Sequence, residues 1–385
     1  MNAHRKICVV IGSRANYSSI KSAMRAIQNH PSLELQVIVG ASAILDRYGS
    51  VVNLIERDGF KISSKLYMLV EGETPATMAK STGLGLMELP TIFTQLQPDI
   101  VLTVGDRFET MATTLAAAYM NIPVAHTMGG EVSGTIDESI RHAVTKFAHI
   151  HFPASRDAKE RILKLGERTE DVYLVGCPRI DLVDEILKTP NTSIQNLFET
   201  GVGERFSLNE PFILVSEHPV TTEYGAGEKQ ISTTLNAVAA INLPAVVLWP
   251  NADAGSDDIA RGIRKFREQN KAKNMHFFKN LSITDYVHLM KKTVCLVGNS
   301  SSGIREGAFI GTPVVNIGSR QDSRERGENV LDASHEQNLI EAAIKKQIQH
   351  GPYKSEPIYG DGKAGEKIAQ ILSKCEVKIQ KRITY

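Results

Sequence analysis

The residues with the clearest capacity for chemistry lie in positions 293–321, TVCLVGNSSSGIREGAFIGTPVVNIGSRQ. An apolar run is followed by a serine-rich turn containing Ser300 and Ser301, and then by an amphipathic pattern. This order predicts a strand, a turn and a helix start, where free backbone N–H groups and the helix dipole favour anions. Glu306, one helical turn on, suits the vicinal hydroxyls of a ribose, and Arg320 adds a cation. The segment predicts a phosphate site, although serine-rich helix caps also occur without a ligand.

Polar residues also follow other apolar runs, at the points where predicted strands end. Ligands of open α/β sheets bind outside the carboxyl ends of the strands, so we expect these residues to share one site. Each alone has a structural explanation, such as a helix start or a solvated turn, but their number at strand ends predicts a real site. In the first half they are Arg14, Ser18, Asp106, Arg107, Glu131 and Asp137, and in the second half His218, Asn251 and Asp253.

Absent motifs narrow the class of ligand. The sequence contains no Walker A pattern, no GxGxxG dinucleotide fingerprint and no HExxH metal motif. A phosphate-bearing ligand without a nicotinamide or ATP role remains. A nucleotide sugar fits a cleft with phosphate-binding groups on one side and carboxylates, acting as general acid and base, on the other.

Apolar, β-branched runs alternate with segments of helical period along the chain. The runs are apolar throughout, as expected for a parallel sheet covered by helices on both faces. The pattern predicts an α/β protein with two Rossmann-like, doubly wound domains. Strands are predicted at 6–12, 35–40, 99–105, 122–127, 149–155, 172–176, 211–217, 244–250, 275–279, 294–298 and 313–318, and helices at 19–29, 109–120 and 283–292.

The predicted strands are too many for one sheet, and the GCPRID segment suggests a division near residue 180. We predict an N-terminal domain over 1–180 that carries the catalytic carboxylates. A C-terminal domain over 181–363 is predicted to bind the nucleotide. The last helical stretch, 364–375 within the terminal segment 364–385, is expected to pack back on the first domain.

Composition excludes several classes of partner. A chain of 385 residues suffices for two domains, and a formal net charge of +1 favours neither nucleic acid nor an anionic membrane. The four cysteines lie far apart without a CxxC pair, so we expect free thiols and no metal site. No signal peptide or membrane-length apolar run is recognised, and we expect a cytoplasmic protein.

The motifs at the strand ends are similar to those of UDP-N-acetylglucosamine 2-epimerases, in the hydrolysing branch that opens sialic-acid-type biosynthesis. The similarity spans nearly the whole chain. The matching segments are GSRANYS (12–18), GDRFE (105–109), GGEVSGTIDESIRHAVTKFAH (129–149), EHPVTTE (217–223), PNADAGS (250–256) and 298–329.

The resemblance implies two Rossmann-like domains of the glycosyltransferase-B type facing across a cleft, with no metal and no redox cofactor. We also expect a homodimer or homotetramer. It implies that UDP-N-acetylglucosamine loses its C2 proton and UDP to give a glycal, and that water then adds to give N-acetylmannosamine. Asp106 and Asp137 correspond to catalytic carboxylates. The residues that correspond to UDP contacts are Arg14, Ser18, His218, Ser300, Ser301, Glu306 and Arg320.

Two positions depart from the family pattern. Met128 stands where a catalytic glutamate is usual, and methionine transfers no proton, so either Glu131 takes over that work or the enzyme acts on a different sugar. Asn16 stands where an aspartate is common, which removes a charge near the phosphate-side loop.

Three alternatives to UDP-N-acetylglucosamine 2-epimerisation remain open from the sequence. The same reaction on UDP- or GDP-linked N,N'-diacetylbacillosamine is the nearest. A nucleotide-sugar glycosyltransferase shares the fold but needs an acceptor. A binding protein without activity is the third, and the presence of both Asp106 and Asp137 argues against it.

Overall fold

The computed structural model describes residues 4–46, 50–71, 74–133, 136–189, 197–250, 255–269, 273–279 and 281–384. The chain forms two compact units. Unit 1 contains the chain up to Val132, then Ile136–Leu182, and the C-terminal segment from Tyr359. Unit 2 is formed mainly by Val183–Ile358, so the division falls within helix α8 (Pro178–Lys188).

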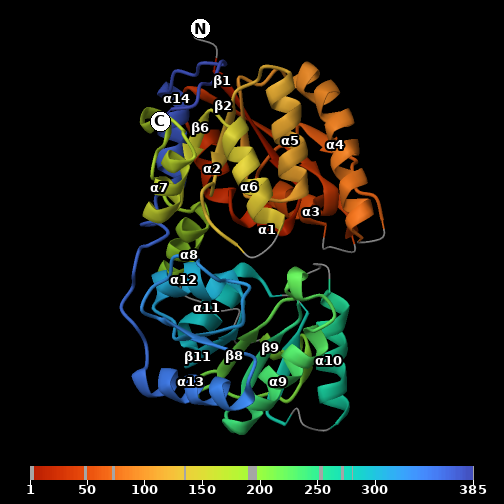
Figure 1. Cartoon of the computed structure of the whole chain (residues 1–385), viewed down its shortest axis with the longest axis vertical. Coiled ribbons are helices and arrows are strands. Elements are labelled where there is room, and N and C mark those ends of the chain that lie inside the picture. Colours follow the sequence, from red (N-terminus) through yellow and green to blue (C-terminus); the bar gives the residue numbers. More distant parts are fainter. Residues whose placement is uncertain are drawn as a thin grey trace. The chain divides into compact units, whose positions relative to one another are not determined.

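Unit 1 is built on a six-stranded sheet in the order β3-β2-β1-β4-β5-β6, with every pair parallel. Its strands are β1 (Arg5–Ile11), β2 (Leu33–Gly40), β3 (Ser64–Leu66), β4 (Ile100–Val104), β5 (Val124–Thr127) and β6 (Ile150–Phe152). Its helices are α1 (Arg14–Ser18), α2 (Lys21–Gln28), η1 (Ala41–Ile44), α3 (Val51–Arg57), α4 (Pro75–Leu96), α5 (Phe108–Tyr119), α6 (Ile136–Phe147), α7 (Arg156–Lys164), η3 (Thr169–Asp171) and α14 (Ala364–Lys374) (Figure 1).

The apolar run 7–11 of β1 follows from burial on both faces. Ile7, Val9 and Ile11 point into a core shared with α2, α3 and α14, while Cys8 and Val10 point into a core shared with α4 and α5. Because successive side chains of a strand alternate between faces, each face needs its own apolar residues.

Helix α14 is held at both of its ends by residues far away in sequence. The Asp181 carboxylate accepts hydrogen bonds from the backbone N–H groups of Ala364 (2.9 Å) and Gly365 (2.7 Å). Arg5 Nη1 donates to the carbonyls of Leu372 (2.7 Å) and Cys375 (2.9 Å). These contacts satisfy backbone groups that have no partner inside the helix, and they fasten the C-terminal part of the chain to unit 1.

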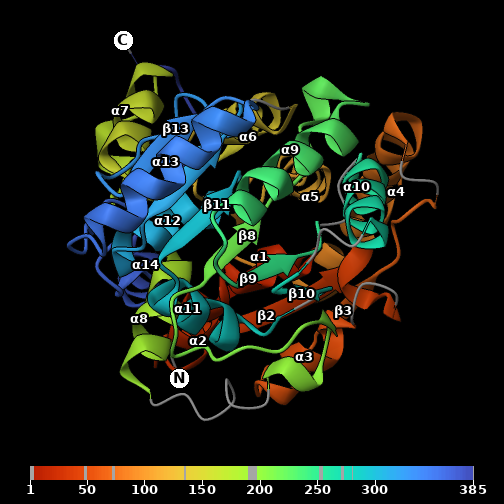
Figure 2. The same cartoon turned by 90° about the horizontal axis from the view of Figure 1, so that it is seen from below.

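Unit 2 contains a seven-stranded sheet in the order β13-β12-β11-β8-β9-β10-β7, in which only β7 is antiparallel to its neighbour. Helices α9, α10 and α13 pack on one face, and α11 and α12 pack on the other (Figure 2). The strands are β7 (Val202–Gly203), β8 (Ile213–Ser216), β9 (Ala245–Leu248), β10 (Met275–Phe278), β11 (Cys295–Gly298), β12 (Val314–Ile317) and β13 (Val330–Ala333). The helices are η5 (Thr221–Glu223), α9 (Gly227–Ala240), α10 (Ser256–Glu268), α11 (Ile283–Lys292), α12 (Ser301–Ile310) and α13 (Gln337–His350).

The prediction of an α/β chain with two doubly wound sheets is confirmed, but one predicted strand is wrong. In 172–176 only Val172 forms a bridge, to His151. Further along, the Val175 N–H donates to the carbonyl of Pro153. Proline has no N–H, so it cannot donate the second hydrogen bond that would continue the strand pairing. The edge strands β3, β7 and β13 were not predicted. β3 and β7 have only three and two residues, and β13 is incompletely buried and contains Asp332.

Among the residues described, no helix has the length and apolar character needed to cross a lipid bilayer.

Candidate active site

The predicted site residues fall into two sets, one in each unit. The order of strands reverses between β1 and β4 in unit 1 and between β8 and β11 in unit 2. Ligands of open α/β sheets bind outside the carboxyl ends of strands at such points. The polar turns of both units follow these strands and their neighbours β5 and β12.

In unit 1, the buried guanidinium of Arg141 binds the Asp106 carboxylate and the backbone of Glu131. Arg141 is 1% exposed, and its Nη2 donates to Asp106 Oδ2. Its Nη1 donates to the backbone carbonyl of Glu131 at 2.7 Å. Asp137 lies one helical turn before Arg141 on α6. The loops after β4 and β5 and the first turns of α6 are thereby joined around one cation.

The imidazole of His126 holds the turn that carries Asp106. His126 is fully buried at the end of β5, and its Nε2 lies 2.7 Å from the carbonyl oxygen of Gly105. Burial lowers the pKa of His126 to about 4, so the ring is neutral near pH 7 and Nε2–H donates to that carbonyl. A Cβ on Gly129 would lie 2.8 Å from Nδ1, so a larger residue at 129 would displace the ring.

The loop that contains Met128, Gly130 and Glu131 is held mainly through hydrogen bonds of its backbone. Met128 has a left-handed φ of 62° and is 7% exposed, and its N–H donates to the carbonyl of Phe152 at 3.1 Å. Arg161 Nη1 donates to the carbonyl of Gly130 at 2.5 Å. The Glu131 side chain is 4% exposed. The loop therefore holds Glu131 in a buried position, and its acid–base role remains a prediction.

Asn16 has a structural role that the sequence interpretation missed. Its Oδ1 accepts from the Gly12 N–H (3.1 Å), and its Nδ2 donates to the carbonyl of Val104 (3.2 Å). The side chain is 6% exposed and connects the ends of β1 and β4. An aspartate at this position would still accept the hydrogen bond from Gly12, but as a carboxylate it could not donate one to Val104. The asparagine therefore makes a contact that an aspartate cannot make. Arg14 is exposed at the start of α1, and Ser18 Oγ donates to its carbonyl at 3.0 Å.

Glu109 orients Arg107 at the same end of the sheet. Glu109 is 3% exposed, and its Oε1 lies 3.2 Å from Arg107 Nε. A Cβ on Gly12 would lie 2.3 Å from Glu109 Cγ, so the glycine at the end of β1 makes room for this carboxylate. Arg107 is 38% exposed, which leaves its guanidinium accessible to a ligand.

In unit 2, Asn299 links the two strand ends at the reversal point. Its Oδ1 accepts from the His218 N–H (2.7 Å), and its Nδ2 donates to the His218 carbonyl (2.8 Å). Arg320 Nη1 donates to the Asn299 carbonyl at 3.2 Å. The structure thus brings His218 and Arg320 to the same turn.

Three hydroxyl groups, from Ser300, Ser302 and Tyr286, lie at the start of α12, the helix that carries the buried Glu306. Ser300 is the N-cap, and its Oγ lies 2.8 Å from Ser302 Oγ, which lies 2.5 Å from the hydroxyl of Tyr286. Glu306 is 3% exposed. Burial, and the nearby charge of Glu306, raise the pKa of Tyr286. Hydroxyl donors and the helix terminus together suit a phosphate, and Glu306 suits a polyol.

Glu217, directly before His218, is a buried carboxyl group with no hydrogen bond to the described residues. It is 2% exposed, and burial raises its pKa to about 7. The nearby hydroxyl of Thr234 on α9 partly offsets this rise in pKa. It does not form a hydrogen bond with the Glu217 carboxyl group. Glu217 therefore changes its charge near neutral pH.

Two predicted residues, Asn251 and Asp253, lie outside the described residues. Sequence reasoning assigned no site role to several residues that the structure places beside the candidates. For one of them a signal existed, because Arg141 follows Asp137 by four residues and so lies on the same face of a helix. The residues without a predicted role are Arg141, His126 and Tyr286, together with Glu109, Glu217 and Asn299, which the sequence places at strand ends.

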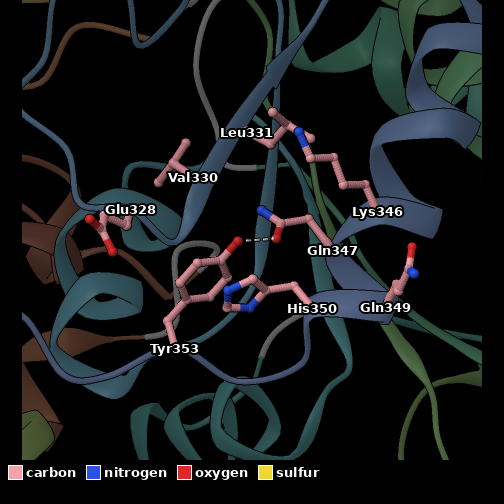
Figure 3. Close-up of a pocket in the computed structure, with 8 residues that line it drawn as sticks. All are labelled: Glu328, Val330, Leu331, Lys346, Gln347, Gln349, His350 and Tyr353. Atoms are coloured by element: carbon pink, nitrogen blue, oxygen red, sulfur yellow. Dashed lines mark hydrogen bonds between the residues drawn. The ribbon is translucent and has the colours of Figure 1, made fainter.

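A pocket of about 340 Å³ lies elsewhere in unit 2 and contains no predicted site residue. It adjoins Val330, at the amino end of β13, whereas the candidate residues follow carboxyl ends. In Figure 3 the Tyr353 hydroxyl donates to Gln347 Oε1 (2.8 Å), and the His350 ring stacks on Tyr353 with centroids 3.8 Å apart. The full lining is Glu328, Val330, Leu331, Lys346, Gln347, Gln349, His350 and Tyr353.

Similarity to known proteins covers almost the whole chain. The chain is 33% identical over 368 residues to the UDP-N,N'-diacetylbacillosamine 2-epimerase (hydrolyzing) of Legionella pneumophila, covering 96% of this chain and 95% of that one. It is 33% identical over 344 residues to the GDP/UDP-N,N'-diacetylbacillosamine 2-epimerase (hydrolyzing) of Campylobacter jejuni, covering 89% and 87%.

The fold is that of solved 2-epimerases. The crystal structure of UDP-GlcNAc 2-epimerase from Neisseria meningitidis bound to UDP-GlcNAc superposes with a TM-score of 0.81 at 20% identity, covering 95% of this chain and 99% of that one. The model of the family described as UDP-N-acetylglucosamine 2-epimerase matches residues 25–373. With its strand-end motifs, its two doubly wound sheets and this match, the chain belongs to the UDP-N-acetylglucosamine 2-epimerase family.

Proposed function

We propose that this protein is a hydrolysing 2-epimerase that converts UDP-N-acetylglucosamine and water into N-acetylmannosamine and UDP. A base removes the C2 proton while the C1–O bond to UDP breaks, which leaves a 1,2-glycal. Water then adds its hydroxyl to C1 and a proton returns to C2 from the opposite face. The products together contain the atoms of substrate and water.

The observation that carries this proposal is the arrangement of Asp106, Arg141 and Asp137 in unit 1. Asp106 is paired with Arg141, and Asp137 precedes it by one turn on α6. Two carboxylates suit the removal and return of a proton. Glu131 is the third candidate. The proposed sugar and phosphate contacts from this unit are Arg14, Ser18 and Arg107.

Unit 2 supplies the proposed nucleotide site. In this proposal the diphosphate binds at Ser300 and Ser301, at the start of α12, and the ribose binds at Glu306. The remaining proposed contacts are His218, Asn251, Asp253 and Arg320.

Incubation of the protein with nucleotide sugars, without an acceptor, tests the function. We expect release of UDP and the appearance of the free 2-epimeric sugar by NMR. A nucleotide-linked epimer as the product would indicate a non-hydrolysing enzyme. Turnover only after addition of an acceptor would indicate a glycosyltransferase, and binding without turnover would indicate an inactive binding protein.

UDP-N,N'-diacetylbacillosamine is the second candidate substrate. It is favoured by the names of the two relatives at 33% identity, both hydrolysing 2-epimerases of this sugar nucleotide. The two sugars differ at C4 and C6, so a comparison of kcat/KM for both, together with the GDP-linked form, decides between them.

Replacing Glu306 by alanine is expected to weaken UDP binding by about 1.5–3 kcal/mol, the range for hydrogen bonds to charged groups. Isothermal titration calorimetry with UDP measures the effect. Glu306→Gln keeps the volume of this buried side chain, and Glu268→Ala, at an exposed position of α10, serves as the control. Unchanged affinity in both Glu306 variants would place the ribose elsewhere.

Activity is expected to persist in EDTA and to need no added cofactor. Among the residues described, no group of three His, Cys, Asp or Glu side chains is arranged to hold a metal ion. The rate of UDP release after dialysis against chelator measures this. Loss of turnover that a divalent ion restores would contradict it.

We also propose that the enzyme is a homo-oligomer that pairs through the outer face of α4. On this face Leu84 is 38% and Met87 is 74% exposed, and a Cβ on Gly83 would meet no described atom within 4 Å. Lys80 and Glu88 lie four residues to either side of Leu84. An antiparallel pair of α4 helices centred on Leu84 therefore sets Lys80 against Glu88 of a second copy, twice.

Combined replacement of Leu84 and Met87 by lysine is expected to weaken this association at least about tenfold, because charged groups at a helix interface are costly. Sedimentation equilibrium measures the association constant. Thr94→Lys, at an exposed position near the C-terminal end of α4, is the control. An unchanged association constant in the double variant would mean that the copies meet elsewhere.

A further inference from the structure

Within unit 1, a buried carboxylate binds the C-terminal segment of the chain to the part that contains α6. Glu167 is 5% exposed, and its Oε1 accepts from Lys146 Nζ at 2.7 Å. Its Oε2 lies 2.6 Å from Lys381 Nζ and 3.1 Å from His151 Nε2. Burial by itself raises the pKa of Glu167, but the hydrogen bonds from His151, Lys146 and Lys381 lower it to about 2, so the carboxylate stays charged. Glu167, Lys146, His151 and Lys381 are here called the tail clamp.

Lys381 also caps the C-terminal end of α6. Its Nζ donates to the carbonyls of Thr145 (3.3 Å), Lys146 (2.9 Å) and Ala148. The last carbonyls of a helix have no partner within it, and the negative end of the helix dipole favours a cation. The ammonium group of Lys381 meets both requirements.

Further contacts hold the same segment along the edge of the unit. His149 Nε2 lies 2.9 Å from the carbonyl of Ile379, and the Thr384 N–H donates to the carbonyl of Gly166 at 3.0 Å. A Cβ on Gly166 would lie 2.5 Å from Ile383 Cγ1, so only a glycine at this position leaves room for the C-terminal segment. In both views the C-terminus lies beside α7 (Figures 1 and 2).

Helix α6 connects the tail clamp to the candidate carboxylates. Asp137 lies in its first turn, and Arg141, which binds Asp106, lies one turn later. The next turn carries Thr145, whose Oγ1 donates to the Arg141 carbonyl at 3.0 Å. A cap at the end of the helix therefore fixes the axial position of the groups near its start.

We propose that the C-terminal segment is a positioning element for the active site, in which Lys381 holds α6 so that Asp137 and Arg141 meet Asp106 correctly. The proposal rests on the proposed function for its catalytic consequence. A displacement of about 1 Å at a reacting group costs up to about 100-fold in rate, so the clamp controls turnover without contacting substrate.

The test compares Lys381→Met with Lys378→Met in the full chain. Methionine keeps much of the aliphatic stem of Lys381 and removes its charge and donors, whereas Lys378 is an exposed residue of the same segment. For Lys381→Met we expect kcat to fall between about 10- and 100-fold, with the UDP dissociation constant and binding stoichiometry unchanged. Lys381→Arg, which restores a cation and donors, is expected to recover most of the rate, and Lys378→Met to match wild type.

Hydrogen–deuterium exchange of α6 gives a readout that does not need turnover. In Lys381→Met, amides around Asp137 and Arg141 are expected to exchange at least about tenfold faster than in wild type, with unit 2 unchanged. Unchanged exchange there, or a kcat within twofold of wild type, would overturn the proposal. A loss of activity matched by an equal loss of UDP-binding stoichiometry would also overturn it, since that is unfolding. An inactive wild type would instead count against the proposed function. In that case the hydrogen–deuterium exchange data would still show whether Lys381 holds α6 in place.

Discussion

Replacing Asp106 or Asp137 by asparagine is expected to lower kcat by about 10²–10⁴-fold, the usual cost of losing a positioned acid or base. In Asp106→Asn the amide oxygen still accepts a hydrogen bond from Arg141, so the geometry is largely kept while the ability to take up a proton is lost. The Asp137 substitution makes the same change at the start of α6. Single-turnover release of UDP measures the chemical step directly.

The matched control for these variants is Asp184→Asn. Asp184 pairs with Lys188 on the surface of α8, where such an ion pair contributes little to stability. We expect its kcat to equal that of wild type. If either active-site variant kept more than about a third of wild-type kcat, the assignment of that aspartate as an acid or base would be wrong.

The variant Glu131→Gln tests whether Glu131 performs the proton transfer of the family glutamate, whose position Met128 occupies in this chain. Glutamine keeps the shape and much of the hydrogen bonding of a glutamate but does not titrate. A loss comparable to that of the aspartate variants supports a proton-transfer role. Near-normal kcat would leave Glu131 a structural residue of its loop.

The second large effect is a pH dependence of stability that Glu217 causes. Burial raises the pKa of Glu217 from 4.5 to about 7. Because the pKa in the folded state lies above the unfolded value, folding takes up a proton in this interval, and stability falls as the pH rises from about 4.5 to about 7. At 1.36 kcal/mol for each pH unit, the ionised carboxylate destabilises the fold by about 3 kcal/mol above pH 7 relative to pH 4.5.

Glu217→Gln is expected to remove this dependence, because the amide stays neutral. The difference in unfolding free energy between variant and wild type should therefore change by about 3 kcal/mol in favour of the variant between pH 4.5 and pH 8. Trp249 is the single tryptophan of the chain and packs on the core of unit 2, so its fluorescence in urea reports the unit that contains Glu217. A difference that stayed constant with pH would show that Glu217 does not ionise in this range.

The sequence by itself determined the two doubly wound sheets and the positions of most of their strands. Parallel strands that are covered on both faces favour apolar residues at nearly every position, and the runs 7–11 and 294–298 have this character. The strand ends then follow from where each run stops. The candidate residues at those ends, among them Asp106, His218 and Ser300, can be named from the order of residues along the chain.

Only the tertiary structure decided which partner each of these side chains has. Arg141 bonds Asp106 from a different loop, Asn16 connects β1 to β4, and Lys381 reaches the end of α6 from the C-terminal segment. These contacts join residues that are distant in sequence, and no local pattern records them. They depend on loop paths and helix positions, which follow from the packing of the whole unit, whereas strand periodicity is a local property that each segment carries alone.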